Sequence, residues 1–252
     1  EGGEPRQQLL FYLREKSVLL IMDNFEHLLS GVDLVSEILN TAPHVKIIAT
    51  SRARLNIHGE QLFHLSGMDF PVWETPADAL DYDAIKLFLQ SANRIHLNFE
   101  LTPDNLKFIT RICRLVEGMP LGILLASSWL EMLAPEEIAG EIEKSLDFLE
   151  TQQRDVPERQ HSMRAVFDYS WKLLTPGEQN VFMKAAVCRG GFTREAAQQV
   201  TGASLRDLMG LVDKSLLQRN PSGRYGIHEL LRQYGAEKLS NVSEKLEAVR
   251  NQ

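Results

Sequence analysis

The stretch VLLIMDNFEHLL, residues 18–29, places five apolar residues directly before Asp23 and Asn24. A short apolar run that ends in turn-forming residues predicts a buried β-strand over 18–22. The runs VKIIAT (45–50) and EQLFHL (60–65) predict a second buried strand and a shorter third one. A helical pattern at 4–15 precedes the first of these strands, and one at 31–42 lies between the first and the second. This alternation predicts a parallel sheet that is covered by helices on both faces.

The remainder of the chain shows helical patterns and one hairpin. Residues 75–157 predict a helical bundle, in which Thr102 and Pro103 begin one helix as N-cap and first helical residue. Residues 158–240 predict three helices, a hairpin around PSG (221–223) and a last helix, which together describe a winged helix. We therefore predict domains at 1–74, 75–157 and 158–240, and a tail or the start of a further domain at 241–252.

Composition and charge indicate an ordinary globular protein with an uneven charge distribution. Apolar residues make up 44% of the chain and the net charge is -7. Residues 1–157 carry 13 Lys and Arg against 24 Asp and Glu, which gives -11, whereas 158–240 carry 12 against 8, which gives +4. Cys113 and Cys188 lie far apart in apolar stretches, which favours free thiols in a reducing compartment. We expect a cytoplasmic protein without a membrane span.

The carboxyl ends of the first two predicted strands carry residues suited to a nucleotide. An apolar strand that ends in Asp is how P-loop nucleotide-hydrolysing proteins hold magnesium, and Asp23 has this position. Arg52 follows the next strand, at the same edge of the sheet, where an arginine can contact a terminal phosphate. The alternatives are an ordinary Asp-Asn turn at Asp23 and a surface arginine at Arg52.

Four ordered stretches resemble motifs of a known protein class. They are VLLIMDNFEHL (18–28), KIIATSRARLNIHGEQLFHL (46–65), EGMPLGILLAS (117–127) and YGIHELLRQYGAEKL (225–239). Together they resemble the signal-transducing ATPases with numerous domains (STAND), the class of the NB-ARC and AP-ATPase proteins, and most of all bacterial regulators with a DNxEH motif. The resemblance spans nearly the whole chain. It implies the C-terminal part of a P-loop NTPase sheet, then a helical bundle and a winged helix, with ATP or ADP and magnesium as cofactors.

The resemblance also implies roles for single residues. Asp23 would be the Walker B residue that holds magnesium, and Arg52 would be the sensor of the terminal phosphate. Gly118 and Pro120 match the family's GLP turn, whose proline packs by the adenine. His228 matches the histidine of the MHD motif, which contacts the β-phosphate of ADP; the alternative is a partly buried histidine with satisfied hydrogen bonds.

Two departures from the family pattern concern hydrolysis. Asn24 stands where many relatives have a second acid, and a neutral amide cannot accept a proton from the attacking water. Glu26 is the candidate catalytic substitute, or else a carboxylate favoured by a helix start. Glu229 replaces the aspartate of MHD.

A phosphate-binding loop of the form GxxxxGK[ST] does not occur in the sequence. In the resembled class this loop lies several tens of residues before the Walker B strand, so we expect the chain to be a piece of a larger protein. We expect weak or no ATP binding and no turnover by the chain alone, and slow ATP hydrolysis by the full-length protein.

Three functions remain open. The first is an ATP/ADP-dependent signalling switch that associates with itself or with protein partners when activated. The second is a winged-helix DNA-binding transcription regulator, supported by the +4 charge of 158–240. In the presumed recognition helix, however, Asp207 and Asp213 offset Arg206 and Lys214, so we do not expect DNA binding by this chain. The third is an interaction scaffold that has lost nucleotide chemistry.

Overall fold

The computed structural model describes residues 4–71, 78–96, 99–152 and 156–250. The chain is mostly helical, with a small two-stranded parallel sheet, and divides into two compact units. The first unit comprises residues 1–64 with 213–215, and the second comprises 65–212 with 216–252. The predicted boundary at 74/75 lies outside the described residues, and those at 157/158 and 240/241 stay predictions.

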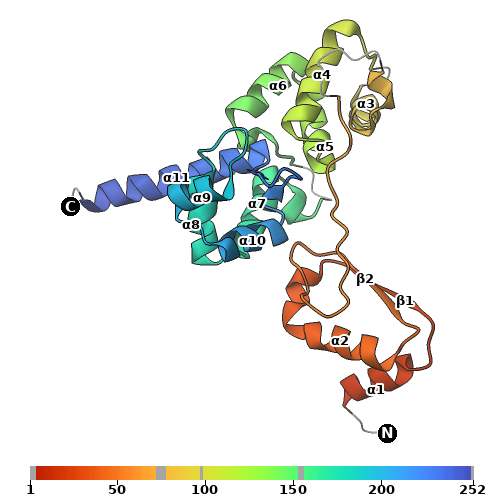
Figure 1. The fold of residues 1–252 in the computed structure, drawn as a ribbon. Helices are drawn as coiled ribbons and strands as arrows, with labels where there is room; N and C mark the ends of the chain where they lie inside the picture. Colours follow the sequence, from red (N-terminus) through yellow and green to blue (C-terminus); the bar gives the residue numbers. More distant parts are fainter. Residues whose placement is uncertain (1–3, 72–77, 97–98, 153–155, 251–252) are drawn as a thin grey trace. The chain divides into compact units, whose positions relative to one another are not determined.

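The first unit is built around the two strands that the sequence predicts most strongly. Strand β1 (Leu19–Met22) pairs in parallel with β2 (Lys46–Ala49), and Leu20 lies opposite Ile47 in the register. The helices of this unit are α1 (Pro5–Leu13), the 3₁₀ helix η1 (Phe25–Gly31) and α2 (Val32–Thr41) (Figure 1). The predicted alternation of helix and strand is therefore confirmed up to residue 49.

The two strands are covered on one face only, so the prediction of strands buried on both faces is wrong. Leu13 of α1, Ile38 of α2 and Ala42, directly after α2, are buried and pack with Leu20 and Ile47. The opposite face carries Leu19, Ile21 and Ile48, which are 51%, 71% and 53% exposed. The physical reason is that both helices lie against the same face, and alternate strand residues point away from them.

The predicted third strand at 60–65 is also wrong. These residues form no helix or strand, and Phe63 and Leu65 are 87% and 85% exposed. A strand requires a partner for its backbone and a surface for its side chains, and the described part of the chain offers this segment neither. An apolar composition therefore does not form a strand by itself.

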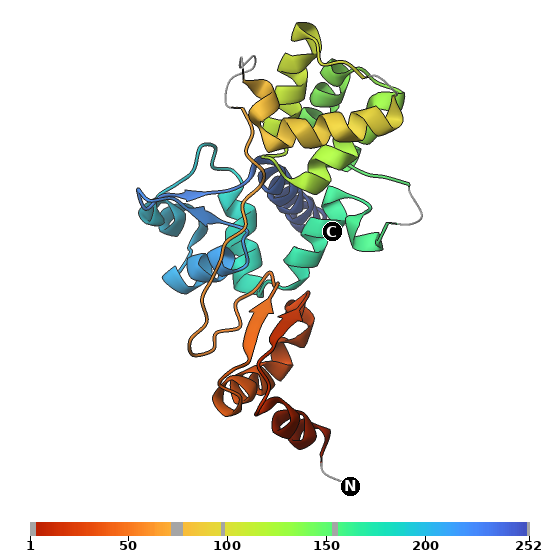
Figure 2. The same ribbon diagram turned by 90° about the vertical axis from the view of Figure 1, so that its right-hand side faces the viewer.

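The second unit consists mainly of helices (Figure 2). From residue 83 onwards the described α-helices are α3 (Asp83–Ile95), α4 (Pro103–Leu115), α5 (Pro120–Ser128), α6 (Pro135–Lys144), α7 (Met163–Lys172), α8 (Pro176–Ala185), α9 (Arg194–Thr201), α10 (Leu205–Asp213) and α11 (Glu229–Arg250). Thr102 caps α4 as predicted, since its side chain accepts a hydrogen bond from the backbone N–H of Asn105. No helix of the described residues is long and apolar enough to span a membrane.

A short hairpin separates α10 from α11. Strands β3 (Gln218–Arg219) and β4 (Tyr225–Gly226) pair in antiparallel fashion. The intervening turn is closed by hydrogen bonds from the N–H of Asn220 to the carbonyl of Arg224 and from the N–H of Gly223 to the carbonyl of Asn220, both 2.9 Å. The predicted order of helices, hairpin and last helix is thus present, and its assignment as a winged helix stays a prediction.

Candidate functional site

Thr50 joins the carboxyl ends of the two parallel strands. Its hydroxyl donates a hydrogen bond to Oδ1 of Asp23 and accepts one, 2.9 Å long, from the backbone N–H of Asn24. Its backbone carbonyl accepts a hydrogen bond from the N–H of Phe25 at 2.9 Å, and its N–H donates to the carbonyl of Met22 at 2.9 Å. Asn24 has a left-handed backbone with φ 61°, a conformation that asparagine tolerates better than most residues. The Asp23 carboxylate is thereby held at the sheet edge and remains exposed.

Glu26 lies in the first turn of η1, close after this edge in the sequence, and its side chain approaches Arg52. Its side chain is 2% exposed, and Oε1 lies 3.8 Å from Nε of Arg52. Its other oxygen, Oε2, is buried and has no hydrogen-bond partner among the described residues. A buried carboxylate is costly unless it is paired, so the Arg52 guanidinium is the group that stabilises it. Asp23, Glu26 and Arg52 are thus brought to one edge of the sheet.

This edge can supply one carboxylate to a cation. Magnesium in nucleotide sites commonly takes one or two carboxylates and completes its shell with water and phosphate oxygens. The exposed Asp23 fits that mode. The described residues contain no group of three or more His, Cys, Asp or Glu side chains that could hold a metal ion by themselves. Asp23 would therefore depend on a phosphate ligand to hold the ion.

In the second unit, the turn between α4 and α5 is fixed by two glycines. Gly118 has φ 67°, and a Cβ at this position would lie 2.0 Å from the carbonyl oxygen of Met68. A Cβ on Gly67 would lie 2.2 Å from the carbonyl oxygen of Glu117. The N–H of Met68 donates to the carbonyl of Gly118 at 2.8 Å, so the two backbones are in direct contact. Pro120 is exposed and begins α5, where its missing N–H costs nothing.

His228, directly before α11, contacts this same turn. Its Nε2 lies 3.2 Å from the carbonyl oxygen of Val116 and 3.8 Å from Oε2 of Glu117, and its side chain is 9% exposed. Its Nδ1 accepts a hydrogen bond from the N–H of Leu230 at 3.1 Å. Because Nδ1 accepts, the proton of the neutral ring belongs on Nε2, which donates to Val116. The N–H of Glu229 adds a 3.1 Å hydrogen bond to Oε1 of Glu117.

Burial keeps the His228 imidazole neutral. Loss of solvent lowers the pKa of His228, while the carboxylate of Glu117, the carbonyl of Val116 and the carboxylate of Glu229 partly oppose this effect. The hydrogen-bond pattern is that of the neutral ring, in agreement with the lowered pKa. Protonation of His228 would place a proton on Nδ1 that faces the N–H of Leu230, and would break that contact.

The structure brings the predicted residues together in two groups. Asp23, Glu26 and Arg52 lie in the first unit, and Gly118, Pro120 and His228 lie in the second. Sequence reasoning missed Glu117, although it directly precedes Gly118. Its carboxylate accepts a hydrogen bond from the N–H of Glu229, the first residue of α11. The φ of 45° at Glu117 is unusual for a residue other than glycine, and such backbone conformations have no signature in a single sequence.

The relatives found by comparison with known proteins are named either as putative transcriptional regulators or as uncharacterised proteins. No protein-family model matches the chain. The chain is 32% identical over 254 residues to a protein of Mycobacterium bovis named "Putative HTH-type transcriptional regulator" and to one of the same name from Mycobacterium tuberculosis. It is 30% identical over 249 residues to an uncharacterised protein of Mycobacterium bovis. These matches cover 96% and 94% of this chain, but only 28% and 61% of the respective relatives.

The solved structures that match include a STAND protein with a tetratricopeptide repeat sensor from Pyrococcus horikoshii, which is 15% identical and is matched over 94% of this chain and 30% of that one. The TM-score of this match is 0.32. The chain spans about 28% of the length of the proteins named as putative regulators.

Proposed function

We propose that the chain is a regulatory segment of a longer transcriptional regulator and acts there as an ATP/ADP-dependent switch. The observation that carries this proposal is the seating of His228 on the turn between α4 and α5, through Val116 and Glu117. This contact joins the last helix to the helical bundle by few polar groups, so a ligand with unequal affinity for the seated and released states would shift the equilibrium between them. The similarity to proteins named as transcriptional regulators supports the regulatory role.

In this proposal Asp23 holds magnesium through water, and Arg52 contacts the terminal phosphate of ATP. Glu26 acts as a positioning residue, since its buried carboxylate faces Arg52 rather than solvent. Gly118, Pro120 and His228 distinguish ADP from ATP by stabilising the seated state. Bound nucleotide and magnesium would supply the charge that these residues recognise. The support is the match of four ordered motifs and the grouping of the residues described above.

The test uses the full-length polypeptide that contains this chain. We expect isothermal titration calorimetry to show ADP binding, about tenfold weaker in His228→Ala, and Mg-ATP binding at least tenfold weaker in Asp23→Ala, since each variant removes a charge-assisted contact. Lys172→Ala, an exposed change at the end of α7, is the control and should leave both affinities unchanged. A full-length protein that binds neither nucleotide would overturn the proposal and leave the interaction scaffold as the better account.

A second candidate function is DNA binding by α8, α9, α10 and the hairpin as a winged helix. The names of the Mycobacterium relatives favour it. The exposed side of α10, however, presents Leu205 and Met209, 49% and 55% exposed, beside Arg206. Such a surface offers few cations to phosphates. Retention of a random duplex in a low-salt gel shift, lost in Arg206→Ala, would establish this candidate, and no retention would remove it.

A further inference from the structure

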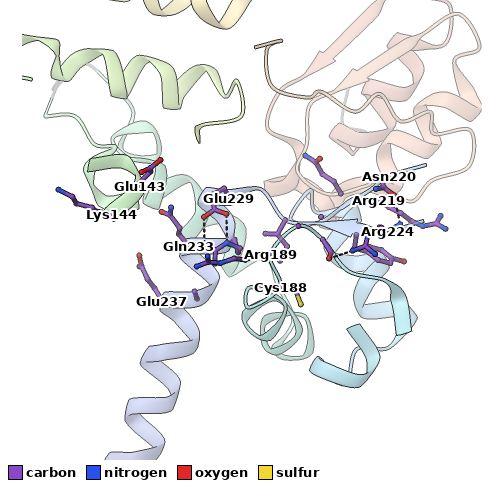
Figure 3. Close-up of a pocket in the computed structure, with 18 residues that line it drawn as sticks. Glu143, Lys144, Cys188, Arg189, Arg219, Asn220, Arg224, Glu229, Gln233 and Glu237 are labelled. Carbon is purple, nitrogen blue, oxygen red and sulfur yellow. Dashed lines mark hydrogen bonds and ion pairs between the residues drawn. The ribbon is translucent and has the colours of Figure 1, made fainter. Parts of the chain in front are cut away.

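The second unit contains a cavity of about 820 Å³ that lies apart from the residues discussed above, except where it adjoins the start of α11. Four elements line it: the end of α6, the loop 188–191 after α8, the hairpin β3–β4 and the first turns of α11 (Figure 3). Arginine is the most frequent charged residue of its lining, with Arg189, Arg219, Arg224 and Arg232 contributed by three of these elements. The cavity is open to solvent, so a small molecule can enter it.

The carboxylates of this lining are already paired. Glu143 forms an ion pair with Arg111 at 2.7 Å, and Glu237 forms one with Arg164. Both of these arginines lie outside the lining. Neither carboxylate therefore depends on an arginine of the cavity.

The third carboxylate, Glu229, is paired inside the cavity. It accepts two hydrogen bonds from Arg232, of 2.8 and 2.6 Å. Arg224 also has a partner, the carbonyl of Gly191 at 2.8 Å. Among the described residues, Arg189 and Arg219 are the lining arginines whose guanidinium groups donate no hydrogen bond. Arg189 does interact electrostatically with the carboxylate of Glu229. Positive charge thus remains available on the loop side and on the hairpin side.

The loop beside Arg189 adds hydrogen-bond donors. Gly190 and Gly191 both have a left-handed backbone, with φ 77° and 81°. In the described part of the chain, no hydrogen bond uses the backbone N–H of Arg189, Gly190 or Gly191. Backbone N–H groups in a turn of this kind are common donors to anions.

The loop is held firmly against the hairpin. Phe192 and Tyr225 exchange two backbone hydrogen bonds of 2.8 Å, and their rings stack with centroids 5.9 Å apart. A Cβ on Gly191 would lie 2.7 Å from the carbonyl oxygen of Tyr225, so glycine permits the close approach. The donors are therefore fixed before any ligand binds, which reduces the entropic cost of binding.

We propose that this cavity binds a small phosphorylated molecule with two or more phosphate groups, recognised by the loop N–H groups with Arg189 and, on the opposite side, by Arg219. Arginine suits phosphate because its planar fork donates two parallel hydrogen bonds. A hollow shape and the presence of three carboxylates favour a small ligand over the backbone of duplex DNA, which requires an extended cationic surface. The proposal goes beyond the switch function and does not depend on it, since it uses none of Asp23, Arg52 or His228.

The probe is inorganic triphosphate, titrated into the 252-residue chain by calorimetry at 50 and 150 mM salt. We expect one site, with affinity weakened about tenfold in Arg189→Ala and again in Arg219→Ala, because each loses a charge-assisted pair. The control is Arg14→Ala combined with Arg94→Ala, two exposed arginines outside the cavity, which changes the net charge as much as the double cavity variant does. Circular dichroism checks that each variant is folded.

Three results would overturn the proposal. They are no binding of triphosphate by the unaltered chain, an equal loss of affinity in the control, and unchanged affinity in the double cavity variant. A random 20-base-pair duplex is titrated in parallel. If the duplex binds through Arg189 and Arg219 and triphosphate does not, the cavity belongs to a nucleic-acid surface and the small-ligand proposal is wrong.

Discussion

The two units use similar apolar sequences but bury them to very different extents. In the first unit, Leu13, Ile38, Ala42 and Val45 form a small buried cluster, while half of the strand side chains face solvent. In the second unit one continuous core runs through α3 to α11 and includes many side chains with no exposed surface. A two-stranded sheet with a small core is marginally stable by itself, whereas a larger core leaves a surplus after the entropy of folding.

This difference shows that local pattern and stability are separate properties. The strands β1 and β2 form where the apolar runs predict them, yet nothing in the pattern guarantees a second covering layer. The helices of the second unit cover one another on several sides, so their patterns and their burial agree. We expect the two units to respond differently to substitutions that remove the same kind of contact.

Phe88→Ala should have the largest effect. Phe88 is fully buried on α3 and packs edge-on against Phe99, with ring centroids 6.5 Å apart. Its loss removes apolar burial and leaves a cavity, which we expect to lower the free energy of unfolding of the second unit by about 3–5 kcal/mol. Chemical denaturation followed by circular dichroism measures this. Met132→Ala, at a side chain 78% exposed, should change it by less than about 0.5 kcal/mol.

Ile38→Ala tests the smaller core. Ile38 is buried on α2 in the cluster beneath the sheet. We expect the free energy of unfolding of the first unit to fall by an amount at the lower end of the usual range of about 2–5 kcal/mol, because an open core can relax around the gap. That cost is comparable to the stability expected of so small a unit, so hydrogen exchange should show loss of protection in β1 and β2 with α4 and α5 unchanged. Leu39→Ala, at the partly exposed neighbour, is the control. Equal loss of protection in both units would contradict the independence of their cores.

Gly118→Ala concerns a backbone contact rather than a core. A Cβ would meet the Met68 carbonyl at 2.0 Å, and φ at this position is 67°. Strain of this kind costs on the order of 1–3 kcal/mol. Because the Cβ would also clash, we expect the free energy of unfolding to fall by an amount near the upper end of this range. Gly140→Ala is the matched control on α6, where a Cβ meets no atom within 4 Å and the helix should gain about 0.5–1 kcal/mol. Thermal unfolding followed by circular dichroism measures both. If the two variants have the same melting temperature, the close approach at Gly118 does not contribute to stability.

Much of the fold follows from local sequence, and the exceptions have physical causes. The strands at 19–22 and 46–49, the cap at Thr102 and the hairpin after α10 were predicted because their signals are short-range. The predictions of a strand at 60–65 and of helices on both faces of the sheet are wrong, because both features depend on partners distant in sequence. An apolar run indicates that burial is favourable, but not what will cover it.

The candidate site shows the same division. The sequence indicated Asp23 and Arg52 because strand ends of a parallel sheet meet at one edge, and the structure places Asp23, Glu26 and Arg52 there. The partner of His228 could not be predicted, because Glu117 lies 111 positions earlier in the sequence and meets it only through the packing of α11 on the bundle. The functional roles of these residues stay predictions.

The smallest expected effect is the pH dependence at His228, where opposing charges reduce the influence of burial. Its pKa is lowered in the folded state, so below the ordinary histidine pKa of about 6.5 the unfolded chain binds a proton that the folded chain does not. Stability therefore falls as pH decreases through this window, and the loss should be absent from His228→Gln. The measurement is the difference in free energy of unfolding between the two proteins from pH 8 to pH 5, in which the other titrating groups cancel. A difference that moves the opposite way would mean that Glu117 and Glu229 outweigh burial and hold a protonated His228. The seating of α11 would then be an ion pair that strengthens in acid, rather than a neutral contact that acid breaks.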